Sequence, residues 1–535
     1  MRTPGFCGNA RLVGLFAFAG AVASTGPSAA VVCAQSAPRV VSLPLEEGER
    51  AMGALMADVD GDGVLDLVVA RSRADSRELV AFRGRTVGAP LEVEPHWRLG
   101  LPGDVVAFAL GDVVDGPQAD PVLISGRGVF AARPGAPEAE RYLRLVELPV
   151  LWQLSPKQSI AAYPELLVDL DGDGRVDLLV PTASGYSALR QVRNAAAELE
   201  GSAFEALGEA RLPDTAALAA ARGLARNAPG SEDSGVSVRV RLGVGGVSRA
   251  PTLLAVTDSV PAPFVVPWSG PRNSALVALD DRFLHVWPIG TGGALTPEPA
   301  ASHVSPVELD PRRRLDVSYV ALLADLDRDG REDVVLVASD QRSKDVRTQV
   351  LVYTHAATAA GEPAPFGAAG RPAQVLVLAG FVGNVRIEDV DGDGHLDLVA
   401  TSVRPDLLES LRQAATDRVQ AELYVYRGEG GRFARRPALT RILRFAVQDA
   451  DPLVRFATGP SARGPASLLL REEPGSLAYH ALRGGKDGTL DVLPQPLWRL
   501  GLHPEAQVLL FAGAAGLPDT VVALEPNQVL VGRWR

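Results

Sequence analysis

Short apolar runs alternate with acidic or glycine-containing turns along most of this chain, and this pattern predicts many β-strands. The runs are rich in Val, Leu and Ala and show no helical spacing of apolar residues. The 54 Gly and 41 Pro residues suit tight turns between such strands, so we predict an all-β fold. Four of the runs directly follow an acidic loop and read DVDGDGVLDLVV from Asp58, DLDGDGRVDLLV from Asp169, DLDRDGREDVVLV from Asp325 and DVDGDGHLDLVA from Asp389.

The four acidic loops share the pattern Asp-x-Asp-x-Asp-Gly-x-x-Asp, which is typical of a hard-cation site. Side chains at positions 1, 3 and 5 converge on one ion, a backbone carbonyl at position 7 adds an oxygen, and the Asp at position 9 completes the shell. Gly at position 6 allows the sharp turn. Because all ligands are oxygens, calcium is favoured over zinc or copper. We predict about four calcium ions, bound by sixteen aspartates: Asp58, Asp60, Asp62, Asp66, Asp169, Asp171, Asp173, Asp177, Asp325, Asp327, Asp329, Asp333, Asp389, Asp391, Asp393 and Asp397.

An EF-hand begins with the same residues, but it requires a Glu at position 12 and a helix on each side. Position 12 is Val69, Val180, Leu336 or Ala400 in the four loops, and the flanking residues favour strands. We therefore predict that each loop joins two strands. An acidic turn without metal is the alternative for any single loop. The fourfold recurrence of the spacing favours metal, because clustered carboxylates repel one another without a cation.

Weaker copies of the loop and the following strand occupy the gaps between the four clear ones. Together the eight copies begin near residues 58, 112, 169, 243, 325, 389, 458 and 511. The intervals between these starts run from 53 to 82 residues, which we take as the size range of β-propeller blades. We predict eight four-stranded blades, or seven if one weak copy is spurious. The weak copies are Gly111–Gly116 with Asp120, Gly243–Leu254, Ala457–Leu470 and Phe511–Leu524.

The two ends of the chain are predicted to close the ring. After the last weak copy only two strands remain, Thr520–Leu524 and Gln528–Trp534, whereas Arg39–Leu43 adds one strand before the first loop. That first strand completes the final blade and removes an open sheet edge. The segment Trp97–Leu101 recurs as Trp498–Leu502; we interpret these tryptophans as packing anchors between blades, with sugar-binding platforms as the alternative.

With these motifs, the chain resembles the FG-GAP/VCBS repeat proteins and is similar to the N-terminal propeller of integrin α subunits. The resemblance covers residues 39–535 and implies a β-propeller whose loops bind calcium between the first two strands of a blade, in a mainly structural role. The implied ligands are the sixteen aspartates named above. Integrin-type repeats carry Gly-Ala-Pro after the second strand, where this chain has Ala70-Arg71-Ser72 or Pro181-Thr182-Ala183. This difference favours the bacterial VCBS-like branch.

The first 34 residues read as a secretion signal peptide. Arg2 and Arg11 give a positively charged start, and the apolar stretch Leu12–Ala23 follows them. This stretch is shorter than the ~20 residues that a membrane span needs. We therefore expect a secreted, periplasmic or cell-surface protein with no transmembrane segment. Cys7 and Cys33 both lie in this segment, so the mature chain would contain no disulfide. A lipid anchor on Cys33 is the minor alternative.

Two insertions are predicted within the β pattern. Residues 195–237 are Ala-rich, with a possible helix at Thr215–Arg226, and we interpret them as a partly disordered surface loop. Residues 404–420 contain a capping-box-like start, Asp406 with Glu409, followed by apolar residues at helical spacing. We expect a small helix there, covering the edge or rim of one blade.

Charge and motifs narrow the function. The chain has 64 acidic residues and a net charge of −11. The sixteen loop aspartates alone exceed this negative excess, so the acidity of the chain comes largely from the predicted metal sites. Nucleic acid is excluded as a partner, for want of a basic tract with interleaved aromatics. The seven histidines form no metal-binding pair, and no Gly-x-Ser-x-Gly motif occurs. We therefore predict a non-enzymatic adhesion, recognition or scaffolding module with a protein or glycan ligand. The alternative is a polysaccharide-acting propeller, either a lectin or a calcium-dependent lyase.

Overall fold

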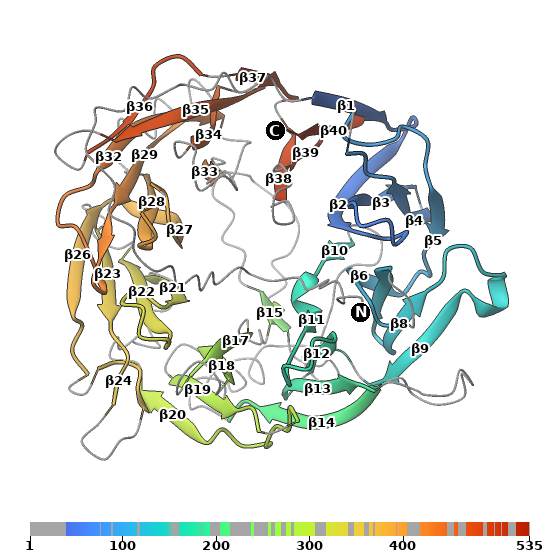
Figure 1. Cartoon of the computed structure of the whole chain (residues 1–535), viewed down its shortest axis with the longest axis horizontal. Helices are drawn as coiled ribbons and strands as arrows, with labels where there is room; N and C mark the ends of the chain where they lie inside the picture. Colours follow the sequence, from blue (N-terminus) through green and yellow to red (C-terminus); the bar gives the residue numbers. More distant parts are fainter. Residues whose placement is uncertain are drawn as a thin grey trace, which may run out of the picture.

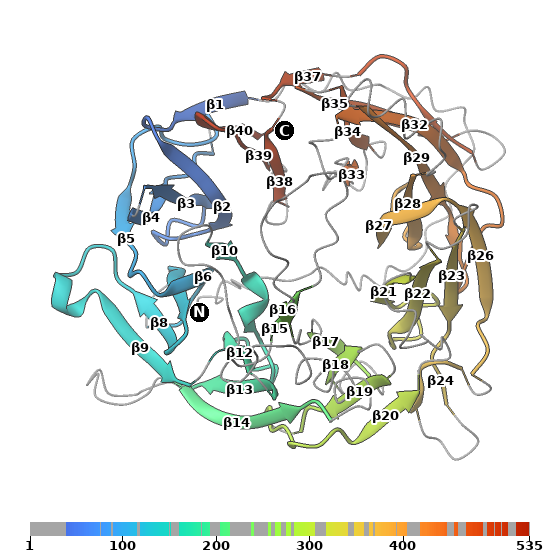
Figure 2. The same cartoon turned by 180° about the vertical axis from the view of Figure 1, so that it is seen from behind.

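The computed structural model contains eight small antiparallel sheets arranged around a ring, so the chain is an eight-bladed β-propeller (Figures 1 and 2). The predicted all-β fold and eight blades are confirmed. The structure describes residues 39–533 except 75, 87–88, 115–117, 149, 151–159, 183, 193–203, 214–236, 240–254, 258–262, 269–273, 280–282, 291, 305–316, 341–346, 358–362, 368–369, 392, 404–417, 447–453, 458–466, 474, 485–488, 497, 504 and 512–519. The predicted signal peptide therefore lies outside the described residues.

Blades 1 to 4 contain four strands each, and blade 2 has one further short strand. Their strands, in order within the sheet, are β2 (Glu49–Ala57), β3 (Asp66–Arg73), β4 (Ser76–Phe82) and β5 (Trp97–Gly100); β6 (Val105–Gly111), β7 (Asp120–Ser125), β8 (Gly128–Ala132) and β9 (Tyr142–Glu147), with β10 (Ala161–Ala162) parallel to β6; β11 (Leu167–Val168), β12 (Asp177–Thr182), β13 (Gly185–Gln191) and β14 (Phe204–Arg211); and β17 (Pro263–Pro267), β18 (Ser274–Leu279), β19 (Phe283–Pro288) and β20 (Ala301–Val304).

Blades 5 to 8 follow the same plan. Blade 7 has two short outer strands that both pair with its third strand, and blade 8 takes its outer strand from the start of the chain. The strands are β21 (Val317–Ala324), β22 (Asp333–Asp340), β23 (Arg347–Tyr353) and β26 (Gln374–Ala379); β27 (Phe381–Glu388), β28 (Asp397–Val403), β29 (Arg418–Tyr426) and β32 (Leu439–Ala446); β33 (Val454–Ala457), β34 (Ser467–Glu473), β35 (Ser476–Gly484), β36 (Leu490–Val492) and β37 (Trp498–Gly501); and β38 (Gln507–Phe511), β39 (Thr520–Leu524), β40 (Gln528–Arg533) and β1 (Arg39–Pro44).

Smaller elements decorate the ring. They are the strand pairs β15 (Ser237–Arg239) with β16 (Ala255–Thr257), β24 (Ala356–Ala357) with β25 (Pro363–Ala364), and β30 (Gly428–Glu429) with β31 (Arg432–Phe433), and the 3-10 turns η1 (Glu138–Glu140) and η2 (Pro164–Leu166). Within the described part of the chain, neither turn nor any other helix has the length and apolar character to cross a bilayer.

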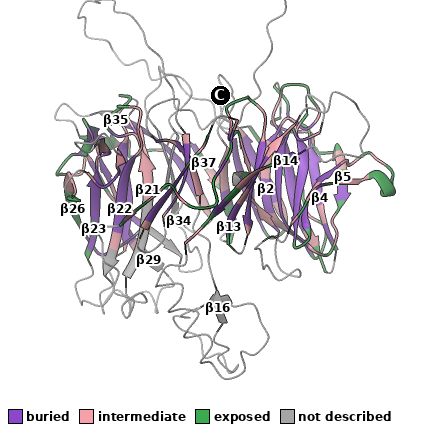
Figure 3. Ribbon diagram, turned by 90° about the horizontal axis from the view of Figure 1, so that it is seen from below, coloured by how far each residue is buried: buried purple, intermediate pink, exposed green. Residues whose placement is uncertain are grey.

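The core is divided into eight apolar clusters, and each cluster lies between two neighbouring blades. On β3, Leu67 and Val69 pack toward blade 8, whereas Val68 and Ala70 pack toward blade 2. Side chains of a strand alternate between its two faces, so a strand enclosed on both faces is apolar at every position. This explains the continuous apolar runs of the sequence, and Figure 3 shows the resulting buried residues through β4, β22 and β23.

The ring closes by pairing of the two chain ends, as predicted. β1 pairs antiparallel with β40, with Arg39 opposite Arg533 and Leu43 opposite Val529. Leu43 has no exposed surface and packs in the cluster between blades 8 and 1. Blade 8 therefore obtains its fourth strand from the segment that begins the described chain.

Because β1 joins the two ends, we expect Leu43→Ala to destabilise the whole ring. A fully buried Leu truncated to Ala costs about 2 to 5 kcal/mol of unfolding free energy. Val40→Ala on the same strand is the control, since Val40 is 42% exposed, and its cost should stay below about 1 kcal/mol. Urea denaturation of both variants measures the difference. Equal unfolding free energies for the two variants would show that β1 does not hold the ring closed.

Three sequence predictions need correction. The fourth blade turns between β17 and β18, so the placement of its loop at Gly243–Leu254 is wrong. Residues 204–211, within the predicted insertion 195–237, form β14, the outer strand of blade 3. Residues 418–420, within the predicted helical insertion 404–420, belong to β29. The strand in the first insertion was hidden because alternating polar residues on β14, the outer strand of blade 3, resemble a surface loop. In the second, only the first three residues of β29, the third strand of blade 6, fall within the predicted insertion. The predicted helices at Thr215–Arg226 and from Asp406 lie outside the described residues.

The other weak copies fall at the predicted places. β6 and β7 flank the Gly111–Asp120 segment, β33 and β34 flank the turn after Ala457, and β38 and β39 flank the turn after Phe511. Trp97 and Trp498 begin the outer strands β5 and β37, and both pack in inter-blade clusters, as their interpretation as anchors predicted. The Trp498 ring stacks on Tyr479 with centroids 5.2 Å apart.

Candidate metal centres

The four acidic loops occupy one equivalent place in blades 1, 3, 5 and 6, and are called here the first to fourth loops. Each joins the first strand of its blade to the second, so the prediction that the loops join strands is confirmed. In the first loop, Asp58 directly follows β2 and Asp66 is the first residue of β3. The other three position-9 residues, Asp177, Asp333 and Asp397, likewise begin the second strand of their blades.

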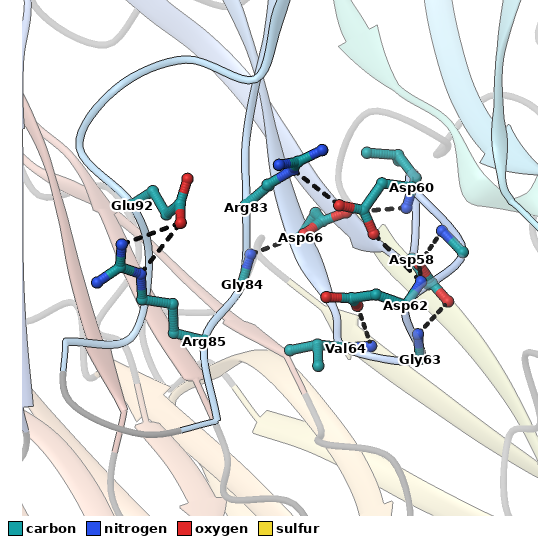
Figure 4. A network of polar contacts seen from close by, with 12 residues as sticks. Asp58, Asp60, Asp62, Gly63, Val64, Asp66, Arg83, Gly84, Arg85 and Glu92 are labelled. Carbon is teal, nitrogen blue, oxygen red and sulfur yellow. Dashed lines mark hydrogen bonds and ion pairs between the residues drawn. The ribbon is translucent and has the colours of Figure 1, made fainter.

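Backbone hydrogen bonds shape the first loop (Figure 4). The Asp58 carboxylate accepts from the backbone N–H of Gly61 at 2.7 Å and of Gly63 at 2.8 Å. The Asp62 carboxylate accepts from Val64 N–H at 2.7 Å. Gly63 has φ +82°, and the equivalent glycines of the other loops have φ between +80° and +84°. A left-handed residue at position 6 is therefore the sharp turn that the motif predicted.

Three carboxylates gather in every loop. Each offers an oxygen, and the three oxygens lie within 4.8 Å of one another. The residues at positions 1 and 3 take part each time; position 5 is the third member in the first and third loops, and position 9 in the second and fourth. This donor set of carboxylate oxygens fits a calcium ion. The groups are Asp58, Asp60 and Asp62; Asp169, Asp171 and Asp177; Asp325, Asp327 and Asp329; and Asp389, Asp391 and Asp397.

The aspartate at position 9 also has a structural task that the sequence did not reveal. In the first loop, Asp66 is 1% exposed, and its two oxygens accept from Val59 N–H at 3.0 Å and Gly84 N–H at 2.7 Å. One carboxylate thereby ties the start of its loop to the residues after the third strand. The same two bonds recur in the other loops: Leu170 and Gln191 donate to Asp177, Leu326 and His355 to Asp333, and Val390 and Gly428 to Asp397.

Burial changes the protonation of these carboxyl groups. Loss of water raises the pKa of Asp66, Asp177 and Asp397 to about 6 and that of Asp333 to about 7, although the two backbone N–H groups act in the opposite direction. The neighbouring loop carboxylates raise the pKa further. A cation in the loop would favour the charged form, since an opposite charge nearby lowers the pKa of a carboxyl group.

The degenerate loop of blade 2 keeps the hydrogen-bonding aspartate at position 9 but lacks the other metal-ligand aspartates at positions 3 and 5. Asp120 stands at position 9 and accepts from the N–H groups of Val113 at 3.3 Å and Val114 at 2.9 Å. Burial raises its pKa to about 6, as for the other position-9 residues. Position 3 of this loop is Val114 and position 5 is Gly116, so the converging carboxylates are missing. The position-9 aspartate thus organises the strand junction even where a cation site is incomplete.

Arginines pair with the position-3 aspartate in three of the four loops. Arg83 Nε lies 2.8 Å from Asp60 (Figure 4), and Arg427 lies 2.6 Å from Asp391. Arg190 lies 3.9 Å from Asp171. Each arginine immediately precedes the residue whose N–H binds the position-9 carboxylate, and Thr354 takes this place in blade 5. The guanidinium groups offset part of the repulsion among the loop carboxylates.

The loops also contact the blades that follow them. A side chain at Gly431, in the turn between β30 and β31 of blade 6, would meet Asp327 Cβ of the third loop at 3.1 Å. A side chain at Gly293 of blade 4 would likewise meet Asp171 Cβ of the second loop, at 3.0 Å. Glycine at these two turns therefore lets the neighbouring blade approach the loop. Sequence reasoning treated each loop as part of one blade and missed this contact.

Solved structures that are similar to this chain include two distant ones. No protein-family model matches the chain, and no curated protein matches it. Among solved structures, the exotype rhamnogalacturonan lyase YesX is similar at 10% identity and a TM-score of 0.33, over 92% of this chain and 76% of the lyase. The V. cholerae biofilm matrix protein Bap1 is similar at 12% identity and a TM-score of 0.26, over 94% of this chain and 67% of that protein.

Proposed function

We propose that this chain is an exported, calcium-binding β-propeller of the FG-GAP/VCBS type that acts as a non-enzymatic adhesion, recognition or scaffolding module. The observation that carries the proposal is the gathering of three carboxylates within 4.8 Å in each of four equivalent loops. Oxygen donors of this kind and number suit calcium. The proposal assigns export to residues 1–34, which read as a signal peptide.

Calcium in these loops would act on stability. Each loop begins at the end of a first strand, and its last aspartate begins the second strand, as Asp58 and Asp66 do in blade 1. An ion bound between them would cross-link two strands and remove the repulsion among their carboxylates. A mature chain without cysteines would thus obtain from metal ions the cross-links that disulfides provide in smaller exported domains.

The recognition role is supported by how the loop carboxylates are used. Asp58, Asp62 and Asp66 accept backbone hydrogen bonds at a strand junction, as structural groups do. A ring of blades held in this way offers rigid outer strands and connecting loops to a partner. Rigid display of this kind suits binding, since little conformational entropy is lost on association.

Equilibrium dialysis with radioactive calcium tests the proposal. We expect about four ions per chain, with the dissociation constants of roughly 10⁻⁴ to 10⁻³ M that extracellular modules show. Asp58→Asn with Asp60→Asn should reduce the stoichiometry by one ion. Asp112→Asn, in the blade 2 loop that lacks the ligand set, is the control and should leave it unchanged. Less than one ion per chain at 10-fold excess over these constants, roughly 10 mM calcium, would refute calcium binding.

A further inference from the structure

A groove of about 550 Å³ lies on the outside of the ring, where blade 5 meets blade 6. One wall consists of five consecutive residues, 373–377, on and just before the outer strand β26. The other wall contains Arg432 and Phe433 of β31, together with Arg435. Figure 1 shows β26 on the outer side of blade 5. The groove therefore follows the length of a strand, and none of its lining residues is a ligand residue of the acidic loops.

The strand along this groove has a free edge. Among the described strands, β26 pairs only with β23. Alternate N–H and C=O groups of an edge strand are unpaired and can accept another strand. Val375 and Val377 are 48% and 57% exposed, whereas Leu376 and Leu378 are buried in the cluster between blades 5 and 6. The strand thus presents both a backbone edge and two apolar side chains to a ligand.

An amide group already spans one end of the groove. The Gln374 side chain accepts from Phe433 N–H at 2.7 Å and donates to the Phe433 carbonyl. This pair of bonds is the one that a peptide unit makes with a neighbouring strand. These bonds tie the β30–β31 hairpin of blade 6 to β26 and so join the two walls at this end of the groove.

The second wall carries positive charge without a counter-charge. The side chains of Arg432 and Arg435 are exposed, and neither guanidinium has an ion pair or a hydrogen bond within the part of the chain that the structure describes. The whole chain has a net charge of −11, so this basic wall contrasts with the rest of the molecule. Arginine binds carboxylates through paired N–H groups, which makes an acidic ligand the complementary one.

The aromatic residues of the groove distinguish a peptide from a sugar chain. Tyr426 and Phe433 are only 6% and 3% exposed, because both rings pack in the cluster between blades 5 and 6. Stacking of a sugar ring needs an exposed aromatic face, and this groove, lined by a backbone edge and valines, offers none. A peptide strand added at the edge of β26 would use what the groove does offer: main-chain N–H and C=O groups for hydrogen bonds, and exposed valines for alternate side chains.

We infer that this groove binds an extended acidic segment of a partner protein, which adds to β26 as a fifth strand of blade 5. Main-chain hydrogen bonds run to β26, alternate side chains cover Val375 and Val377, and carboxylates of the segment pair with Arg432 and Arg435. Five strand residues span about 17 Å, so five or six residues of the partner fill the groove. The inference deepens the proposed recognition function, but it uses none of the calcium ligands.

The test is fluorescence anisotropy with labelled decapeptides on the full chain in calcium. The probe alternates Val and Glu, and its counterpart alternates Val and Lys. We expect binding of the Glu peptide only, weakened at least tenfold by Arg432→Glu with Arg435→Glu. Arg50→Glu with Arg144→Glu, on the exposed surface of blades 1 and 2, is the charge-matched control and should leave binding unchanged. Equal loss in both double variants would overturn the inference, since it would reflect net charge alone.

Two further probes examine strand addition itself. N-methylation of one alternate set of peptide amides should abolish binding, whereas methylation of the other set should be tolerated, because only one set faces β26. Equal tolerance of both sets would overturn strand addition. Tight binding of polygalacturonate at this groove, lost in Arg432→Glu with Arg435→Glu, would replace the peptide by an acidic glycan. Failure of peptide binding with four calcium ions still bound would reject this inference and leave calcium binding intact.

Discussion

Removal of calcium by EDTA should lower the melting temperature of this protein by about 6 to 11 °C relative to 10 mM calcium. At dissociation constants of about 10⁻⁴ to 10⁻³ M, each site adds roughly 1.4 to 2.7 kcal/mol of unfolding free energy at that concentration. Four sites together add about 6 to 11 kcal/mol. Because the unfolding entropy of a chain this long is about 1 kcal/mol per degree, each kcal/mol corresponds to roughly 1 °C. Differential scanning calorimetry in EDTA and in calcium measures the shift.

The size of this shift should depend on pH, since calcium binds the ionised carboxylates. Without calcium, a carboxyl group with a pKa of about 6, such as Asp397, holds its proton more tightly in the folded chain than in the unfolded chain. The unfolding free energy of the calcium-free protein therefore falls as the pH rises from about 4 to about 6. The calcium-dependent shift should grow over the same interval and be largest above pH 7. Magnesium at equal concentration is the control, because it keeps its water shell more strongly. A melting curve that EDTA leaves unchanged at pH 7.5 would contradict the stabilising role.

Asp397→Ala should be the most damaging single substitution in the fourth loop, even in EDTA. The Asp397 side chain is fully buried, and its removal leaves the N–H groups of Val390 and Gly428 without acceptors. Each unsatisfied buried N–H group costs about 1 to 3 kcal/mol, so for two of them we expect a loss of about 2 to 6 kcal/mol of unfolding free energy. Urea denaturation in EDTA measures this structural part by itself.

Two matched variants separate structure from metal binding. Asp393→Ala removes an exposed carboxylate of the same loop, so it should lower stability in calcium and have little effect in EDTA. Asp120→Ala removes the position-9 carboxylate of the blade 2 loop, and its cost should be the same in both buffers. If Asp397→Ala and Asp393→Ala have equal effects in EDTA, position 9 acts only as a ligand, and the anchoring role assigned to it is wrong.

The parts of the fold that could be predicted are those with a local chemical cause. The acidic loops placed four strand junctions correctly, because Asp at positions 1, 3 and 5 and Gly at position 6 must occur in that order to form the turn. The short final repeat and the extra strand Arg39–Leu43 predicted ring closure, because an open edge strand is unfavourable. In blade 4, residues 268–273 between β17 and β18 contain no acidic residue, so nothing local distinguished this turn from any other. The prediction therefore settled on Gly243–Leu254 instead.

The sequence alone determined the strand-rich character of the chain and the places of the four acidic loops, because each depends on neighbours within about ten positions. Only the tertiary structure decided which carboxylates also hold the backbone, since the N–H of Gly84 lies 18 residues from Asp66. It also decided the ion pair of Arg83 with Asp60, which connects two segments of blade 1. The groove between β26 and β31 likewise arises only where blade 5 meets blade 6. The physical reason is common to all three: hydrogen bonds and charges act over a few ångströms in space, and folding alone brings those groups within that distance.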